Sequence, residues 1–236
     1  MKILILGAMH GNEPLGPQVV KAFEQNPIPN IDVALANPPA LQKNVRFVEK
    51  DLNRSFPGST NGSSFEDRRA AEIVELCATY DVVLDFHNTN CAGNDCSFVG
   101  QDANSELFDI SSWLNLHRVI VADYDCLNKY APNCLSIEIS LSSDQNQAKV
   151  WYNRIASLAG LKSVPATTKV QKFTFVRRIS LDDKTNFNLE SANLQAFIPL
   201  EASLAKTLGV RSPAYPIFIN DAYTPYNYGG LLNNLD

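Results

Sequence analysis

The sequence lacks the features that define several large classes of protein. Its 236 residues contain no apolar run close to the roughly 18 residues of a membrane-spanning helix, so we expect no membrane association. The five cysteines are odd in number and form no C-x-x-C pair, which argues against a disulfide framework and indicates free thiols in a cytoplasmic protein. The net charge is only −5, so no general affinity for nucleic acids is expected.

Histidine is also scarce, and the positions of its three copies are informative. His10 and His87 each follow a strand-like apolar run, in "ILILGAMHGNEP" and "DVVLDFHNTN". His117 lies at a helix–strand junction in "WLNLHRVI", where a structural role is expected. Two of the three histidines are therefore candidates for a functional site.

Apolar residues make up 45% of the chain, which is enough to fill a large core. Short apolar runs alternate with helix-like segments in the first two-thirds, a pattern typical of an α/β fold with a mostly parallel sheet. We expect strands at 3–6, 31–35, 82–86, 119–122 and 135–139, and helices at 17–25, 65–80, 106–114 and 145–158.

The sequence pattern changes after residue 159. Segments such as "KVQKFTFVRRIS" alternate apolar and polar residues, as antiparallel strands do, and are separated by prolines. We therefore expect an α/β domain over residues 1–162 and a smaller β-rich C-terminal domain over residues 163–236.

Polar groups follow three of the expected strands. In an open α/β sheet, ligands bind outside the carboxyl ends of the strands, so parallel neighbours would bring His10, Glu13 and His87 into one crevice. Two histidines, one carboxylate and an open fourth position are typical of catalytic zinc. The alternative for His10 is a turn histidine that hydrogen-bonds to the backbone. The alternative for His87 is a structural histidine at a strand end whose hydrogen-bonding groups are paired within the protein. Asp85 either orients a ligating histidine or pairs with another buried group.

Further candidates surround this set. Glu138, between two isoleucines in "CLSIEIS", is the candidate general base; the alternative is a strand glutamate that faces solvent or pairs with arginine. The long segment 37–64 is expected to be ordered, and its Arg46, Asn53 and Arg54 suit an oxyanion or a substrate carboxylate. A solvated loop is the alternative there. Cys91 and Cys96 follow His87, so a cysteine ligand to the metal is a further alternative.

Taken together, "GAMHGNEPLG", "NPPALQKNVRFVEKDLNRSF" and "DFHNT" resemble the aspartoacylase and succinylglutamate desuccinylase family of zinc carboxypeptidase-like hydrolases. "SIEIS" resembles the catalytic-glutamate strand of this family, and "YPIFINDAY" resembles a stretch that lends a tyrosine to the active site. The resemblance implies a carboxypeptidase-like mixed, mostly parallel sheet flanked by helices, with the small β-rich C-terminal domain covering the mouth of the active site. It also implies hydrolysis of an N-acyl amino acid, with N-acetyl-aspartate as the first candidate.

The resemblance also implies a role for each site residue. One Zn²⁺ would be held by His10, Glu13 and His87, with Glu138 as general base and Arg46 polarising the scissile carbonyl. The substrate would contact the remaining candidates, which are Asn53, Arg54, Tyr124 and Tyr223.

The sequence departs from the family in one informative place. The family has a further arginine that binds the acidic substrate, and this sequence has Asn128 at the corresponding position. The neighbouring Lys129 is a candidate substitute for that arginine. The substrate class therefore stays open within acyl amino acids. A peptidase or amidase on the same scaffold and an inactive zinc-binding protein are the competing interpretations. A small-molecule substrate is the expected partner, and a homo-oligomer is left open.

Overall fold

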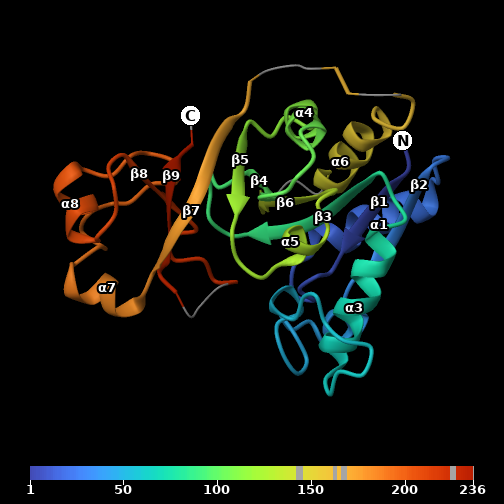
Figure 1. Cartoon of the computed structure of the whole chain (residues 1–236), viewed down its shortest axis with the longest axis horizontal. Coiled ribbons are helices and arrows are strands. Elements are labelled where there is room, and N and C mark those ends of the chain that lie inside the picture. The colour runs from blue at the N-terminus through green and yellow to red at the C-terminus, as the bar shows by residue number, and fades with distance from the viewer. Residues whose placement is uncertain (142–145, 162–163, 166–168, 224–226, 236) are drawn as a thin grey trace.

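One nine-stranded sheet runs through the described part of the chain, in the order β2-β1-β3-β6-β4-β5-β7-β9-β8 (Figure 1). The structure is a computed structural model and describes residues 1–141, 146–161, 164–165, 169–223 and 227–235. The strands are β1 (Ile3–Gly7), β2 (Ile31–Leu35), β3 (Val82–Thr89), β4 (Cys96–Gly100), β5 (Arg118–Ala122), β6 (Cys134–Ser140), β7 (Gln171–Ile179), β8 (Ala214–Ile217) and β9 (Gly229–Asn234).

Eight α-helices and one 3-10 helix are assigned in the same residues. They are α1 (Leu15–Gln25), α2 (Pro38–Lys43), η1 (Leu52–Arg54), α3 (Phe65–Cys77), α4 (Glu106–Trp113), α5 (Leu127–Tyr130), α6 (Gln147–Ala156), α7 (Leu181–Asn186) and α8 (Ala202–Thr207). None of these helices has the length and hydropathy to cross a bilayer.

The mixed, mostly parallel α/β architecture is confirmed, and each expected strand and helix of the first two-thirds is present within a few residues. The expected helix at 145–158 began at Gln145, which lies outside the described residues. The short strand β4 was not expected, and it pairs antiparallel with β6. β3 runs three residues further than predicted, so His87 lies within the strand and not after it.

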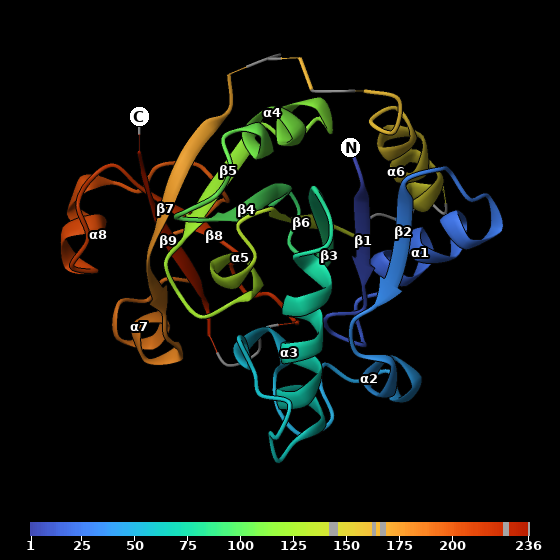
Figure 2. The same cartoon turned by 45° about the vertical axis from the view of Figure 1, so that its right-hand side comes forward.

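The apolar run of β1 is buried on both faces because helices cover both sides of the sheet. Successive side chains point to opposite faces, so Ile3 and Ile5 join one core cluster while Leu4 and Leu6 join another. The first cluster includes residues of α1 and α6, and the second includes residues of α3. Figure 2 shows α3 set apart from α1 and α6. Because helices cover both faces of the sheet, the ends of its strands are the places where a ligand can approach.

The C-terminal segment extends the same sheet. β7 pairs parallel with β5 and antiparallel with β9, which also pairs with β8. A separate core cluster that includes Ile179, Leu208 and Leu231 supports α7 and α8 on this side (Figure 1). The predicted domain boundary falls on residues 162 and 163, outside the described residues, so the division into two domains stays a prediction.

We predict that Asp183→Asn lowers the free energy of unfolding at pH 7 by about 1 kcal/mol. Asp183 forms a capping box with Ser180 at the start of α7 and an ion pair with Arg177. Burial raises the pKa of Asp183, but its contacts with Ser180 and Arg177 lower it more, to below the ordinary value. The stabilisation is therefore present above the unfolded pKa of about 4 and is lost as the pH falls through the folded pKa.

Urea denaturation at pH 7 and at pH 3 measures this effect. Asp182→Asn is the matched control, because it removes the same charge at the neighbouring exposed position. A loss for Asp183→Asn that is no larger than that of the control at pH 7, or undiminished at pH 3, contradicts the prediction.

Candidate active site

A tight turn after β1 positions the first two candidate ligands. Ala8 has a positive φ of 59°, and Gly11 packs directly against the backbone of α2. A Cβ atom on Gly11 would lie 2.1 Å from the carbonyl carbon of Ala40, so only glycine fits there. The turn therefore directs His10 and Glu13 to the carboxyl end of β1, next to β3.

His10, Glu13 and His87 form a compact buried cluster in which one ligand atom from each lies within 4.8 Å of the others. The two oxygens of Glu13 divide between the histidines: Oε1 lies 2.6 Å from Nδ1 of His10, and Oε2 lies 3.2 Å from Nδ1 of His87. The backbone N–H of Asn88 also donates to Oε2, at 3.1 Å. Both Nδ1 atoms therefore face the same point beside the carboxylate.

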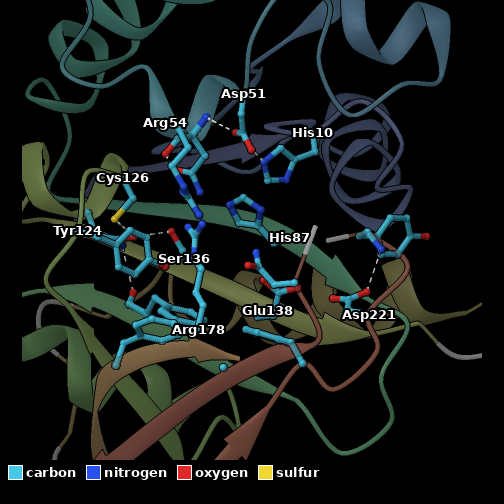
Figure 3. A pocket seen from close by; sticks show the side chains of 18 of the residues that line it. His10, Asp51, Arg54, His87, Tyr124, Cys126, Ser136, Glu138, Arg178 and Asp221 are labelled. Carbon is cyan, nitrogen blue, oxygen red and sulfur yellow. Dashed lines mark hydrogen bonds and ion pairs between the residues drawn. The ribbon is translucent and has the colours of Figure 1, made fainter. Parts of the chain in front are cut away.

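The opposite nitrogen of each histidine ring contacts a second carboxylate, and Figure 3 shows this contact for His10 and Asp51. Nε2 of His10 lies 3.2 Å from Oδ1 of Asp51, and Nε2 of His87 lies 2.8 Å from Oδ2 of Asp85. Metal-ligating histidines usually donate their second N–H to a carboxylate, which fixes the ring and its tautomer. Asp85 thus contacts a histidine nitrogen, which is the first of the two alternatives expected for this residue. Asp51 was not predicted, although it opens the "DLNRSF" segment.

Negative charge is in excess around this cluster. Glu13, Asp51, Asp85 and Glu138 surround the two histidines, and Arg46 is the cation that pairs with Asp51 and Glu13. Burial alone lowers the pKa of His87, but the carboxylates of Asp85 and Glu13 raise it well above the ordinary value. The same field favours a divalent cation beside the Nδ1 atoms, so these residues fit a metal site in both donor type and charge.

Glu138 lies next to this cluster, on the neighbouring strand. In the parallel pairing of β3 with β6 it is the register partner of His87, so both side chains leave the same face of the sheet. Burial, with the nearby Glu13 and Asp221, raises the pKa of the Glu138 carboxyl well above its ordinary value, although His87 and Arg46 act in the opposite direction. A carboxyl group with raised proton affinity suits a general acid–base role.

The segment 37–64 is ordered, as predicted, and Leu52 and Phe56 are buried. Arg46 donates to Oδ2 of Asp51 at 3.1 Å and to the carbonyl oxygen of Tyr223 at 3.0 Å. Arg54 lies over the ring of Tyr124, with Cζ 5.0 Å from the centroid.

Glu66 anchors this segment from the first turn of α3. Its Oε1 accepts hydrogen bonds from the backbone N–H groups of Val48 and Glu49 and from the side chain of Asn37. Burial raises the pKa of Glu66, and these hydrogen bonds lower it to below the ordinary value. Because the bonded backbone lies between Arg46 and Asp51, Glu66 holds the part of the loop that faces the histidines.

The histidine cluster, Glu138 and the side chains of Arg46, Asp51 and Arg54 line one cavity of about 700 Å³. Its lining includes every site residue predicted from the sequence, namely His10, Glu13, Arg46, Asn53, Arg54, His87, Tyr124, Glu138 and Tyr223. Further lining residues that were not predicted as site residues are Phe98, Phe175, Arg178, Phe218 and Asp221. Phe218 and Asp221 lie in "YPIFINDAY", which was singled out only for its tyrosine. No motif marks Phe175 and Arg178, which are brought to the cavity by β7, the strand that pairs with β5.

Other candidates lie elsewhere. Lys129 was a candidate substitute for the missing arginine, but it pairs with Asp125 at 2.7 Å and does not line the cavity. His117 bonds to Asn115 and lies outside the cavity. Among the described residues, neither Cys91 nor Cys96 belongs to the group that could hold a metal.

Comparison with known proteins agrees with this geometry. The sequence profile of the succinylglutamate desuccinylase/aspartoacylase catalytic domain matches residues 1–146, which carry the histidine cluster and Glu138. The chain belongs to this family. A probable aspartoacylase of Nostoc sp. (strain PCC 7120) is 39% identical over 103 residues, which cover 37% of this chain and 35% of the relative.

Other family members carry different names. An N-acyl-aromatic-L-amino acid amidohydrolase (carboxylate-forming) of Xenopus laevis is 33% identical over 104 residues, covering 37% of this chain and 34% of the relative. The matched part thus spans about a third of the length of these curated relatives.

Two solved structures share the fold. Murine aminoacylase 3 has a TM-score of 0.74 and 17% identity, with 100% of this chain and 95% of that chain covered. The succinylglutamate desuccinylase of Chromobacterium violaceum has a TM-score of 0.73 and 17% identity, with 100% and 85% covered. At this identity the two structures support the fold alone, and it extends over the C-terminal segment.

We predict that Glu66→Ala lowers the free energy of unfolding by about 1–3 kcal/mol, because the buried amide of Asn37 and the part-buried N–H groups of Val48 and Glu49 lose their shared acceptor. Limited proteolysis within residues 44–64 should become faster, since the loop loses its anchor.

Glu66→Gln keeps one acceptor oxygen and should lose less stability. Glu72→Ala, on the exposed side of the same helix, is the control and should behave as the wild type in both measurements. Equal proteolysis rates for Glu66→Ala and Glu72→Ala would show that Glu66 does not hold the loop.

Proposed function

We propose that this chain is a zinc-dependent hydrolase that cleaves the amide bond of N-acyl amino acids, releasing a carboxylic acid and a free amino acid. The observation that carries the proposal is the pair of histidines whose Nδ1 atoms converge on Glu13 while their Nε2 atoms contact Asp51 and Asp85. The names of the relatives support hydrolysis of acyl amino acids.

His10, Glu13 and His87 would hold the zinc ion, which when bound supplies a Lewis acid for water and for the scissile carbonyl. The Glu138 carboxylate would accept a proton from the attacking water and later deliver it to the leaving nitrogen. Glu138 is the register partner of His87, which places its carboxyl group beside the proposed zinc site, where one group can serve both steps.

Arg46 and Arg54 would each interact with a different group of the substrate. Arg46 is held by Asp51 beside Glu13, which supports a role in stabilising the oxygen of the attacked carbonyl. Arg54 lines the cavity with Asn53, and its guanidinium has the planar geometry that binds a carboxylate through two hydrogen bonds. Asn53 and Arg54 would therefore bind the α-carboxylate of the substrate.

The cavity supports a small substrate over a long peptide. Tyr124, Phe218 and Tyr223 form part of its walls, and the backbone of Tyr223 is tied to Arg46. Because residues of the C-terminal segment line the cavity together with the α/β core, an acyl amino acid fits the enclosed volume. N-Acetyl-aspartate and related acidic acyl amino acids are the first substrates to test.

We predict about one zinc per chain by elemental analysis, and a lower zinc content in each of His10→Ala, Glu13→Ala and His87→Ala. Asp51→Asn and Asp85→Asn should weaken zinc binding by about 10–100-fold, because each removes the carboxylate that orients a histidine. Arg54→Ala is the control and should retain zinc. Full zinc content in all three ligand variants contradicts the assignment.

We predict that Glu138→Gln retains zinc while kcat for release of the free amino acid falls by about 10²–10⁴-fold, since the proton acceptor is lost. Arg54→Ala should mainly raise KM, because the α-carboxylate is bound before and during the reaction. Amine release from a panel of N-acetyl and N-succinyl amino acids measures both. Undiminished turnover by Glu138→Gln, or turnover of peptides without turnover of acyl amino acids, contradicts the proposed function.

A further inference from the structure

A register shift in β7 directs two side chains of the C-terminal segment into the cavity. Phe175 pairs with Leu232 of β9 and Arg178 pairs with Gly230, so three steps along β7 correspond to two steps along β9. A regular strand would place Phe175 and Arg178 on opposite faces, but the extra residue puts both on the same face. Both line the cavity, whereas Arg177 bonds to Leu208 and Asp183.

The guanidinium of Arg178 has no hydrogen-bond or ion-pair partner among the described residues, although it lines the cavity. Figure 3 shows the side chain extending from β7 into the cavity, toward the side where Arg54 and Tyr124 lie. Asp123 also lines the cavity, but it forms no ion pair with Arg54 or Arg178 within the described residues. An arginine that faces a cavity without an internal anion is available to a ligand anion.

Tyr124 lines the same part of the cavity as Arg54 and Arg178 (Figure 3). Burial raises the pKa of the Tyr124 phenol, and the guanidinium groups of Arg54 and Arg178 act in the opposite direction. Arg54 lies over this ring, 5.0 Å from its centroid. The part of the cavity beside Tyr124 therefore presents two guanidinium groups, which is one more than a single α-carboxylate requires.

The position where relatives were expected to carry a further arginine does not supply this second cation. The amide nitrogen of Asn128 donates to the carbonyl oxygens of Phe98 and Cys134, and its amide oxygen accepts from Ser136. The side chain is buried and fully used in holding β4 and β6 together. With Lys129 outside the cavity, the second cation must come from another element.

We propose that Arg178 is a specificity-determining residue that binds a second carboxylate, on the side chain of an N-acyl amino acid substrate, while Arg54 binds the α-carboxylate. The inference rests on the proposed function, and it adds the residue on β7 that selects the substrate class. The nearby rings of Phe98, Phe175 and Phe218 would contact the methylene groups that connect the two carboxylates.

The test compares isosteric substrate pairs: N-acetyl-L-aspartate with N-acetyl-L-asparagine, and N-acetyl-L-glutamate with N-acetyl-L-glutamine. We expect the zinc-loaded wild type to prefer the acid of at least one pair in kcat/KM by about 10–100-fold, as expected for a hydrogen-bonded charge pair. Arg178→Gln should reduce this preference to within a few-fold, through KM of the acid and with little change for the amide.

Lys129→Gln is the matched control, because it removes the same charge next to the expected arginine position but outside the cavity; its preference should stay unchanged. Equal losses on acid and amide, an unchanged preference in Arg178→Gln, or a wild type that prefers N-acetyl-L-phenylalanine over both acids overturns the inference.

Failure of the proposed function gives a different result. If the wild type releases amine from none of these substrates, the proposed activity is wrong, and calorimetric binding of L-aspartate and L-asparagine then tests Arg178 without turnover. Tighter binding of L-aspartate that is lost in Arg178→Gln supports the role in binding a second carboxylate. Equal binding of the two amino acids to the wild type overturns it.

Discussion

The parallel pairing of β1, β3 and β6 is the constraint on which the site depends. Gly7 ends β1 beside the carboxyl end of β3, and His87 pairs in register with Glu138. A one-residue shift in either pairing would turn the polar side chains to the other face, away from the turn that carries His10 and Glu13. The apolar residues of the same strands are buried on both sides and hold this register in place.

Electrostatics then determine what the aligned side chains can do. A buried carboxylate is costly unless it is paired, and here each of Glu13, Asp51 and Asp85 has a histidine nitrogen as a partner. The histidine rings are therefore oriented before any ligand arrives. Arg46 offsets one negative charge, and the remaining excess favours a bound cation. Burial and the nearby carboxylates of Glu13 and Asp221 raise the pKa of Glu138, although His87 and Arg46 act in the opposite direction.

The C-terminal segment completes the cavity by extending the sheet. β7 adds to β5, and the register shift with β9 directs Phe175 and Arg178 inward. The loop with Asp221 and Tyr223 reaches back to the core through the Thr89–Asp221 hydrogen bond and the bond from Arg46 to Tyr223. The core thus supplies the histidine cluster and Glu138, and the C-terminal segment adds Phe175, Arg178, Asp221 and Tyr223 to the lining of the same cavity.

Local sequence determined the fold class and the compact set of site residues. The apolar run before His10, the glycine turn and the apolar strand that carries His87 each act within a few residues, so composition and spacing were sufficient to predict them, although β3 continues past His87. Asp51, Arg178 and the role of Asn128 depended on tertiary structure. Asp51 meets His10 across 41 positions of sequence, and Arg178 reaches the cavity only because of an irregularity in the pairing of β7 with β9. Contacts between distant segments depend on the packing of the whole sheet, which no local pattern specifies.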